Sequence, residues 1–399
     1  MKTTENKAFS YPDMVVLGST GSVGEQAIDV ALSHGIRVRA LSARSSVARV
    51  EEQARALKPE FCIMDDPAAA ASLKTALADT SVRVLCGVEG ISEMLASLKT
   101  DNENGIVVEN SILGKAGLLP TVEVLRAGYP LALANKESLV VGGDIVMPLA
   151  REKGIEILPV DSEHCAIFQC LRAGRREEIS RILLTASGGP FYGYTKEQLK
   201  SVTLADTLKH PTWNMGAKIT VDSATLMNKG FEVIEAVHLF GVDPSQIEVV
   251  VHRESIIHSM VEYIDNSVIA QMSVPDMRHC VQYALTHPHR TDAGKTMKKL
   301  DLFTQGSLTF SRPDKEVFGL LGLAFSCIET GGALPAALNA ANEVAVAAFL
   351  KEKISFSQIS ETVSRSVDIM KARGAADIHT LDGILETDAD ARRVCEELI

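Results

Sequence analysis

The chain has 399 residues, of which 46% are hydrophobic and 23% are charged, and its formal net charge at pH 7 is −11. This length exceeds what one hydrophobic core supports and predicts two or three domains. The acidic balance argues against binding to a phosphate backbone, so no nucleic-acid partner is expected. No apolar run approaches the roughly 20 residues that span a bilayer, and no signal-peptide pattern opens the chain, so we expect a cytoplasmic protein without a membrane partner.

The first part of the chain alternates between strand and helix patterns. Apolar runs predict strands at residues 14–17, 37–42, 61–64, 82–85, 106–108 and 131–133, and the segments 25–33, 51–57 and 68–77 between them have helical character. Such alternation is typical of a doubly wound parallel sheet. We therefore predict an N-terminal Rossmann-like domain over residues 1–160.

The rest of the chain changes character twice. Residues 161–300, with strands at 182–185, 247–251 and 268–271, predict an α/β catalytic and connective domain. Within it, residues 194–216 contain the only tryptophan, Trp213, and are expected to form a long loop that acts as a lid. Residues 301–312 are predicted to be a linker. Residues 313–399 carry four helical segments, at 316–330, 335–352, from Ser355 with Gln358 as a capping box, and up to 399, which predict a four-helix bundle.

A glycine loop follows the first predicted strand. Gly18, Gly21 and Gly24 are spaced as in a variant of the dinucleotide fingerprint, although a plain tight turn would use the same residues. The second strand ends at Ala43-Arg44-Ser45, where a carboxylate would indicate NAD and an arginine accommodates the 2′-phosphate of NADP. NADPH is therefore favoured, with Arg44 as an ordinary solvated loop residue left open.

Two carboxylates follow the apolar run 155–160. If that strand continues, Asp161 and Glu163 point to one face and can converge on one ion, and Glu232 on a later helix adds a third carboxylate. Oxygen ligands alone favour Mg²⁺ or Mn²⁺, with Co²⁺ as a further option, over zinc. The alternative is that Asp161, Ser162 and Glu163 only cap the helix that follows.

Basic and polar side chains surround this acidic motif. Asn228 and Glu232 share a helix face behind the expected N-caps Asp222 and Ser223, and Lys229 lies beside them. With the loop Ser187-Gly188-Gly189, these residues could cradle a phosphate, unless Lys229 is an ordinary surface lysine. Lys136 follows the apolar run 131–134, at a strand end where α/β sheets bind ligands.

The seven cysteines form no Cys-x-x-Cys pair, which is typical of free thiols in a reducing compartment. Cys165 and Cys170 flank the acidic motif. A nucleophilic role and a simple packing role are both open for them, and packing is the more common.

Several motifs together resemble the 1-deoxy-D-xylulose 5-phosphate reductoisomerase family over nearly the whole chain. They are Gly18-Ser-Thr-Gly-Ser-Val-Gly24, Leu133-Ala-Asn-Lys-Glu-Ser138, Val160-Asp-Ser-Glu-His164, Ser187-Gly-Gly-Pro190, His210-Pro-Thr-Trp213, Met227-Asn-Lys-Gly230 and Leu338-Asn-Ala-Ala-Asn-Glu343. Two stretches depart from the family pattern, Ala43-Arg44-Ser45 and Ser111-Ile112-Leu113-Gly114, and both bear on the cofactor.

The resemblance implies a set of roles for individual residues. It implies metal ligation by Asp161, Glu163 and Glu232, catalytic roles for Lys136, Glu163 and His210, and a lid bearing Trp213 and Met215. The substrate would be bound by Lys136, Ser162, Glu163, Ser187, His210, Trp213, Ser223, Asn228, Lys229 and Glu232. NADPH would be bound by Thr20, Gly21, Ser22, Val23, Ala43, Arg44, Ser45, Asn135, Lys136, Glu137, Gly216 and Met277.

The family reaction is the NADPH- and metal-dependent rearrangement and reduction of 1-deoxy-D-xylulose 5-phosphate to 2-C-methyl-D-erythritol 4-phosphate in isoprenoid precursor biosynthesis. A retro-aldol route and an α-ketol shift are both open, and a homodimer formed through the middle domain is implied. Two competing hypotheses are an NADP-dependent sugar-phosphate or semialdehyde dehydrogenase and a nucleotide-sensing Rossmann protein without turnover. The first needs the glycine loop but no metal, and the second binds NADPH without a reaction.

Overall fold

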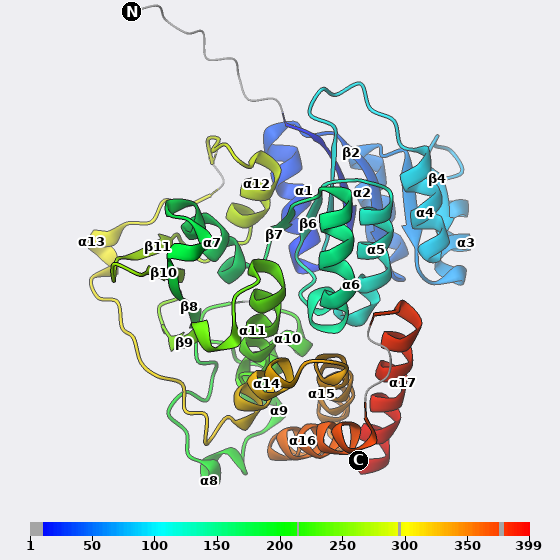
Figure 1. Ribbon diagram of the computed structural model, residues 1–399. Helices are drawn as coiled ribbons and strands as arrows, with labels where there is room; N and C mark the ends of the chain where they lie inside the picture. Colours follow the sequence, from blue (N-terminus) through cyan, green and yellow to red (C-terminus); the bar gives the residue numbers. More distant parts are fainter. Residues whose placement is uncertain (1–10, 214, 294–296, 375–378) are drawn as a thin grey trace, which may run out of the picture.

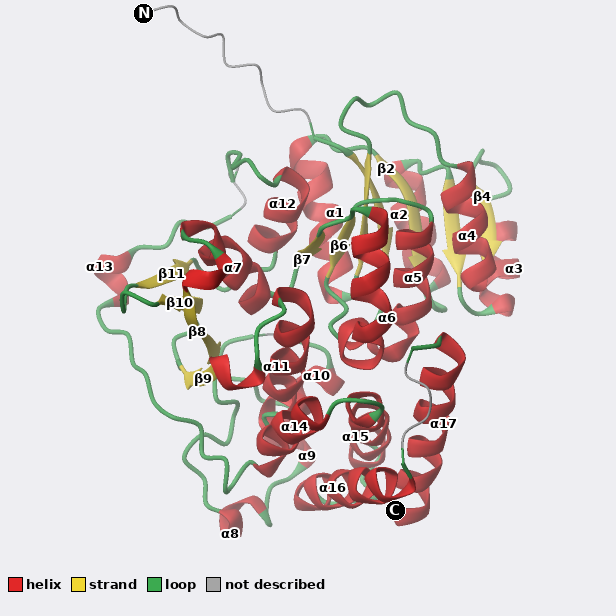
Figure 2. Ribbon diagram, in the orientation of Figure 1, coloured by secondary structure: helices red, strands yellow, loops and turns green. Residues whose placement is uncertain are grey.

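The computed structural model describes residues 11–213, 215–293, 297–374 and 379–399. Figures 1 and 2 show a large sheet flanked by helices, a smaller sheet beside it, and C-terminal helices packed along the bottom of the view. None of the helices in the described ranges is both long and apolar enough to cross a membrane.

The first sheet is parallel throughout and has seven strands in the order β4-β3-β2-β1-β5-β6-β7. This arrangement confirms the predicted doubly wound sheet. The chain reverses its direction of winding between β1 and β5, which makes the crevice at their carboxyl ends the expected ligand position. The strands are β1 (Asp13–Leu17), β2 (Val38–Ala43), β3 (Phe61–Met64), β4 (Arg83–Cys86), β5 (Ile106–Asn110), β6 (Leu131–Leu133) and β7 (Ile157–Pro159).

Helices bury both faces of this sheet, which is why its strands read as continuous apolar runs. One core lies under α1, α2, α3 and α12, and the other lies under α4, α5 and α6. Helix α12 comes from much later in the chain and packs back against α1. The helices are α1 (Ser22–His34), α2 (Val47–Leu57), α3 (Pro67–Ala76), α4 (Gly87–Ser97), α5 (Leu118–Arg126), α6 (Glu137–Lys153) and α12 (Arg278–Thr286).

The second sheet has the order β11-β10-β8-β9, with β8 and β9 parallel and the other pairs antiparallel. Helix α7 (Ser162–Cys170) packs against β8, β10 and β11, and α11 (Met227–Phe240) packs against α6 and α14. Strand β10 was not predicted because His258 and Ser259 interrupt its apolar pattern. Both are buried, and each is hydrogen-bonded, His258 to the Ser273 carbonyl and Ser259 to the Thr185 amide. The strands are β8 (Ile179–Ala186), β9 (Ile247–Val251), β10 (Ile257–Tyr263) and β11 (Val268–Met272).

The segment predicted as one long loop is partly helical. Thr195 with Gln198 and Thr203 with Asp206 form capping boxes that start one-turn helices, α8 (Lys196–Leu199) and α9 (Leu204–Thr207). The predicted N-caps Asp222 and Ser223 are also wrong, because both lie inside α10 (Ala217–Ala224). Helix α11 instead begins after Leu226, which has a φ of 60°.

The C-terminal region is helical, as predicted, and the capping box at Ser355 is present. Its central helix, α15, packs against α14, α16 and α17. The apolar side chains of α14, α15 and α16 share one core with the second sheet and α11, so these helices stabilise that region directly. The predicted boundaries at residues 160, 300 and 312 stay predictions. The helices are α13 (Leu302–Gln305), α14 (Gly319–Thr330), α15 (Leu334–Leu350), α16 (Phe356–Arg373) and α17 (Leu381–Leu398).

Candidate active site

The acidic motif lies at the start of a helix rather than in a strand. Strand β7 ends at Pro159, and Asp161 is the N-cap of α7, with its Oδ1 accepting a hydrogen bond of 3.2 Å from the Glu163 amide. The expected strand geometry for Asp161 and Glu163 is therefore wrong. The capping alternative is correct for Oδ1 of Asp161. Its other oxygen, Oδ2, does not cap the helix and lies 2.6 Å from Lys136 Nζ.

Three carboxylates nevertheless converge. Ligand oxygens of Asp161, Glu163 and Glu232 all lie within 4.8 Å of one another. The bend at the start of α7 supplies two of them, and the second turn of α11 supplies Glu232, which is 1% exposed. A set of oxygen donors with two buried members and one partly exposed member fits a hard divalent cation. The role of these residues as metal ligands stays a prediction.

Two buried lysines balance this negative charge. Lys136 Nζ lies 2.6 Å from Asp161 Oδ2, 3.0 Å from Glu232 Oε1 and 3.1 Å from Asn228 Oδ1. Lys229 Nζ lies 2.8 Å from Glu163 Oε1 and also contacts Glu232. The alternative of Lys229 as a surface lysine is excluded because it is 4% exposed.

These contacts decide the protonation states. Burial disfavours the charged form of Lys136, but Asp161 and Glu232 outweigh it and raise the pKa of Lys136 well above its usual value. Burial also opposes ionisation of Asp161, but Lys136 and His164 hold the pKa of Asp161 well below its usual range. Burial has the opposite effect on two neighbouring carboxyl groups: it raises the pKa of Glu232, and it raises the pKa of Glu235 to about 8.

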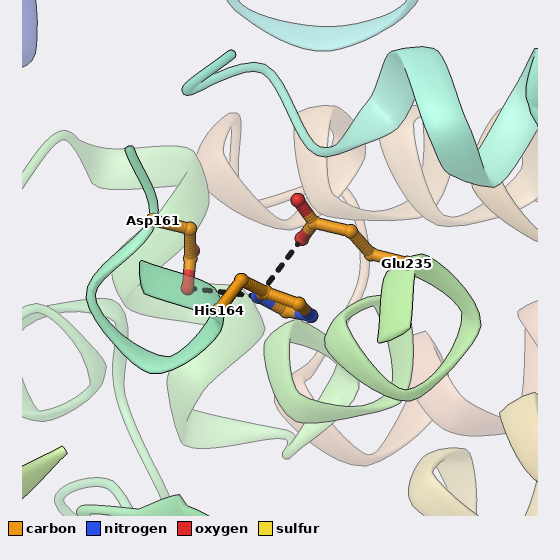
Figure 3. Close-up of side chains that lie close together, drawn as sticks. All are labelled: Asp161, His164 and Glu235. Carbon is orange, nitrogen blue, oxygen red and sulfur yellow. Dashed lines mark hydrogen bonds and ion pairs between the residues drawn. The ribbon is translucent and has the colours of Figure 1, made fainter. Parts of the chain in front are cut away.

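Sequence reasoning missed the layer below the carboxylates, which Figure 3 shows. His164 Nδ1 lies 3.1 Å from Asp161 Oδ1 and 3.2 Å from Glu235 Oε2, and its Nε2 lies 2.9 Å from the Glu232 carbonyl oxygen. Burial lowers the pKa of His164, but Glu235 and Asp161 raise it to about 9. Because its Nε2 faces the Glu232 carbonyl oxygen and its Nδ1 faces two carboxylates, the His164 ring holds Asp161 in place. The sequence did contain a pattern that could have identified these two residues: His164 follows Asp161, and Glu235 follows Glu232, by three positions, which places each pair on one face of a helix.

A second polar group forms around His210. Its Nδ1 accepts hydrogen bonds from the backbone amides of Thr212 and Trp213, so its Nε2 carries the proton. That nitrogen lies 3.0 Å from Ser187 Oγ and 3.1 Å from Ser223 Oγ. Burial, reinforced by Arg253, lowers the pKa of His210 to about 4.

Arg253 also belongs to this group, although the sequence did not single it out. Its guanidinium donates to the carbonyl oxygens of Ser187 and Gly189, at 3.0 Å and 2.7 Å. The expected Ser187 loop therefore lies beside His210 and Ser223, as an anion cradle requires.

The remaining expected substrate residues lie nearby. Ser162 donates a hydrogen bond to Glu163, and the Trp213 ring centre is 6.4 Å from that of His258. Met215 lies in the described chain just before α10, whereas Asn214 lies outside the described residues.

The glycine loop has the geometry of a nucleotide site. Thr20 and Gly21 form the turn after β1, and Ser22 and Val23 are the first two residues of α1. Gly18 has a φ of +90°, and a Cβ there would lie 2.8 Å from the backbone of Ser111, at the end of β5. The departing stretch that begins at Ser111 therefore lies against the loop.

The other expected cofactor residues fall into three places. Ala43, Arg44 and Ser45 lie at the end of β2, with Arg44 and Ser45 exposed, so the solvated-loop alternative for Arg44 stays open. Asn135, Lys136 and Glu137 lie where β6 leads into α6, and Glu137 Oε1 is 2.9 Å from Lys218 Nζ on α10. Gly216 is the N-cap of α10 and Met277 is the N-cap of α12.

Neither cysteine near the acidic motif is accessible. Cys165 and Cys170 are 1% and 2% exposed, and burial raises the pKa of Cys170 to about 11. Both pack in hydrophobic cores, so the nucleophile hypothesis is wrong.

Comparisons with known proteins agree along nearly the whole chain. Family models match at residues 14–143 (1-deoxy-D-xylulose 5-phosphate reductoisomerase), 157–240 (its C-terminal domain) and 272–394 (DXP reductoisomerase C-terminal domain). Curated relatives with this activity include that of Acetivibrio thermocellus, 48% identical over 96% of this chain and 98% of the relative. Another, from Bacteroides fragilis (strain ATCC 25285), is 47% identical over 97% of each.

Two solved structures are similar over nearly their full length. The reductoisomerase of Zymomonas mobilis in complex with NADPH has a TM-score of 0.88 at 38% identity, over 98% of this chain and 99% of that one. A DOX-P reductoisomerase in complex with NADPH, fosmidomycin and magnesium has a TM-score of 0.89 at 36% identity, over 97% and 98%. On this evidence the chain belongs to the 1-deoxy-D-xylulose 5-phosphate reductoisomerase family.

Proposed function

We propose that this chain rearranges and reduces 1-deoxy-D-xylulose 5-phosphate to 2-C-methyl-D-erythritol 4-phosphate, using NADPH and a divalent cation, in the cytoplasm. The observation that carries this proposal is the convergence of Asp161, Glu163 and Glu232 around Lys136, at the end of the sheet that also carries the glycine loop. A dehydrogenase without metal needs the loop but has no use for three converging carboxylates, two of them buried. The family of the chain supports the same activity.

Asp161, Glu163 and Glu232 would hold the cation, and the turn Thr20 to Val23 with the ends of β2 and β6 would hold NADPH. Carboxylate oxygens without a neutral histidine or thiolate favour Mg²⁺ or Mn²⁺. When bound, the cation supplies Lewis acidity at the ketone end of the substrate and NADPH supplies the hydride.

The chain's own residues would bind and orient the sugar phosphate. Lys136 and Lys229 both face the carboxylates, and Lys136 would stabilise an enediolate-like oxygen of the substrate. Neutral His210 offers an Nε2–H donor beside the Ser187 and Ser223 hydroxyls, which together suit phosphate oxygens or sugar hydroxyls. Trp213, on the segment before α10, would exclude water from the reacting carbons.

The decisive variant is Glu232→Gln, which keeps the shape of the side chain and removes its charge. Turnover of 1-deoxy-D-xylulose 5-phosphate with Mn²⁺ should fall by about 100-fold or more, because a buried charge that holds the ion is lost. NADPH affinity, measured by fluorescence titration, should stay nearly unchanged. The control is Glu397→Gln, whose side chain is 62% exposed on α17. Full activity in Glu232→Gln, or in excess chelator, contradicts the proposal.

We also propose a homodimer through the middle domain. Strand β11 forms one edge of the second sheet, and its exposed apolar residues Val268 and Ile269 continue from Ile264 in the preceding turn. Because an exposed apolar edge strand is a template for pairing, a second copy of this chain is the fitting partner.

A further inference from the structure

A second cleft lies on the far side of the metal-binding helices. It has a volume of about 370 Å³, within the range of small-molecule sites, and it opens where α6, α7 and α11 end. The carboxylates lie at the beginning of α7 and in the second turn of α11. The nine residues of α7 separate the cleft from them by roughly 13 Å.

The floor of the cleft is apolar and its rim is cationic. Side chains of Ile157, Phe168, Leu171, Leu239 and Phe240 line the floor, and the exposed side chains of Arg151, Arg172, Arg176 and Glu156 line the rim. Three arginines against one glutamate give the rim a net charge of +2, in a chain whose total is −11.

Not all of these arginines are explained by helix ends. Arg176 donates to the carbonyl oxygen of Gly241, which closes α11, and Arg151 lies in the last turn of α6, where a cation offsets the helix dipole. Arg172 lies beyond α7 in a short 3-10 helix, with its guanidinium 3.3 Å from the His287 ring. Arg172 is thus the one of these three arginines that no helix end explains, and it lies at the mouth of the cleft in a position to meet an anion.

We propose that this cleft binds a small amphipathic phosphate, an apolar chain or ring with an anionic head, and that binding is coupled to the metal site. Inorganic phosphate makes no favourable contact with the apolar floor, and a neutral hydrocarbon makes no favourable contact with the cationic rim. Only a molecule with both parts satisfies both surfaces.

The coupling follows from one contact. Phe240, which lines the cleft, stacks on His164 with ring centres 6.0 Å apart and an angle of 15°. His164 in turn contacts Asp161 and the Glu232 carbonyl, as Figure 3 shows for Asp161. A ligand that restricts Phe240 restricts His164 and so favours one arrangement of the carboxylates. This part of the inference rests on the proposed metal site.

The binding test uses monomeric octyl phosphate, with octanol and inorganic phosphate as the two half-ligands, in calorimetric titrations without substrate or NADPH. Octyl phosphate should bind, and each half-ligand should bind at least about tenfold more weakly. Arg172→Glu should weaken the affinity for octyl phosphate by about tenfold. Leu171→Trp should fill the cleft and prevent octyl phosphate from binding. The matched control is Arg126→Glu, an exposed arginine on α5 with 58% side-chain exposure.

The coupling test measures Mn²⁺ affinity with and without octyl phosphate. Occupancy should tighten Mn²⁺ binding by about fivefold, and Mn²⁺ should tighten octyl phosphate by the same factor. Phe240→Leu should abolish this coupling, so that octyl phosphate at a concentration that saturates the variant leaves its Mn²⁺ affinity unchanged.

The outcomes are distinct. No binding of octyl phosphate, equal binding of octanol, or no effect of Arg172→Glu overturns the assignment of the cleft. Unchanged Mn²⁺ affinity in the occupied protein overturns the coupling. A chain that binds octyl phosphate but neither Mn²⁺ nor the sugar phosphate refutes the proposed function and the coupling, and leaves the cleft assignment standing.

Discussion

His210 shows how hydrogen bonds can decide a role that composition leaves open. Two backbone amides point at Nδ1, so the ring is held as the Nε2–H tautomer and is already neutral at physiological pH. A neutral donor beside two hydroxyls can accompany a phosphate without adding charge to a site that already contains two lysines. The residue type was predictable from sequence, whereas its tautomer was not.

The pKa of His210 leads to a pH prediction. Its folded pKa of about 4 lies below the ordinary value of 6.5, so the folded state binds fewer protons than the unfolded state between these limits. The contribution of His210 to stability is therefore complete above pH 6.5 and is lost as the pH falls toward 4. Urea unfolding at pH 7 and pH 5 should show a smaller loss of stability in His210→Asn than in the parent chain. An NMR titration in which His210 protonates near 6.5 would contradict this.

Thiol accessibility gives a second test. Six of the seven cysteines are buried and only Cys86 is exposed, and burial raises the pKa of Cys62 and Cys327 to about 12. Because the thiolate is the reactive form, the native protein should react rapidly with one equivalent of a disulfide reagent. Cys86→Ser should remove that fast phase, and Cys395→Ser should keep it. Two or more fast equivalents would show that the cores open more readily than the packing implies.

Helix α15 explains a motif that the catalytic roles leave aside. Asn342 is fully buried and donates to Asp222 Oδ1 at 2.7 Å, and Asp222 Oδ2 lies 2.9 Å from Lys218 Nζ. Lys218 in turn pairs with Glu137 at the start of α6. A C-terminal helix thus holds α10 against an expected NADPH residue through three successive polar contacts.

Removing the hydrogen bond from Asn342 to Asp222 should lower the stability of the chain and weaken NADPH binding. Asn342→Ala leaves the buried Asp222 with fewer partners and should lower the free energy of unfolding by about 1–3 kcal/mol. It should also weaken NADPH several-fold, since Lys218 is less firmly held. Asn339→Ala is the matched control on the same helix, because the Asn339 side chain contacts Glu343 instead. Equal NADPH affinity for both variants, by fluorescence titration, would show that the contacts serve stability alone.

The exposed edge of the second sheet gives a prediction for the assembly. Ile269→Lys places a charge on the exposed part of β11, which should prevent pairing with a second copy. Sedimentation equilibrium should show a dimer for the parent chain and a monomer for the variant at micromolar concentration. Leu32→Lys, on the exposed face of α1 with 59% exposure, should stay dimeric. A monomeric parent chain would refute the proposed homodimer.

Much of the fold was predictable because each face of the first sheet is covered. Strands buried on both sides must be apolar throughout, so β1, β3 and β6 appear in the sequence as short runs between helical segments. Strand β10 was not predicted because His258 and Ser259 interrupt its apolar run. These two side chains can be buried because they find hydrogen-bond partners in the folded molecule. The one-turn helices α8 and α9 were missed since short capped turns look like loops.

For the site, the sequence alone identified the residue types: the glycine loop, the carboxylates Asp161, Glu163 and Glu232, and the lysines beside them. It did so because cofactor loops and oxygen ligands need particular side chains at particular spacings. Only the tertiary structure decided that Asp161 caps a helix, that His164 and Glu235 lie beneath it, and that Arg253 joins the Ser187 loop. Those contacts join residues far apart in the chain, and their geometry depends on how α7, α11 and the two sheets pack, which local spacing does not encode.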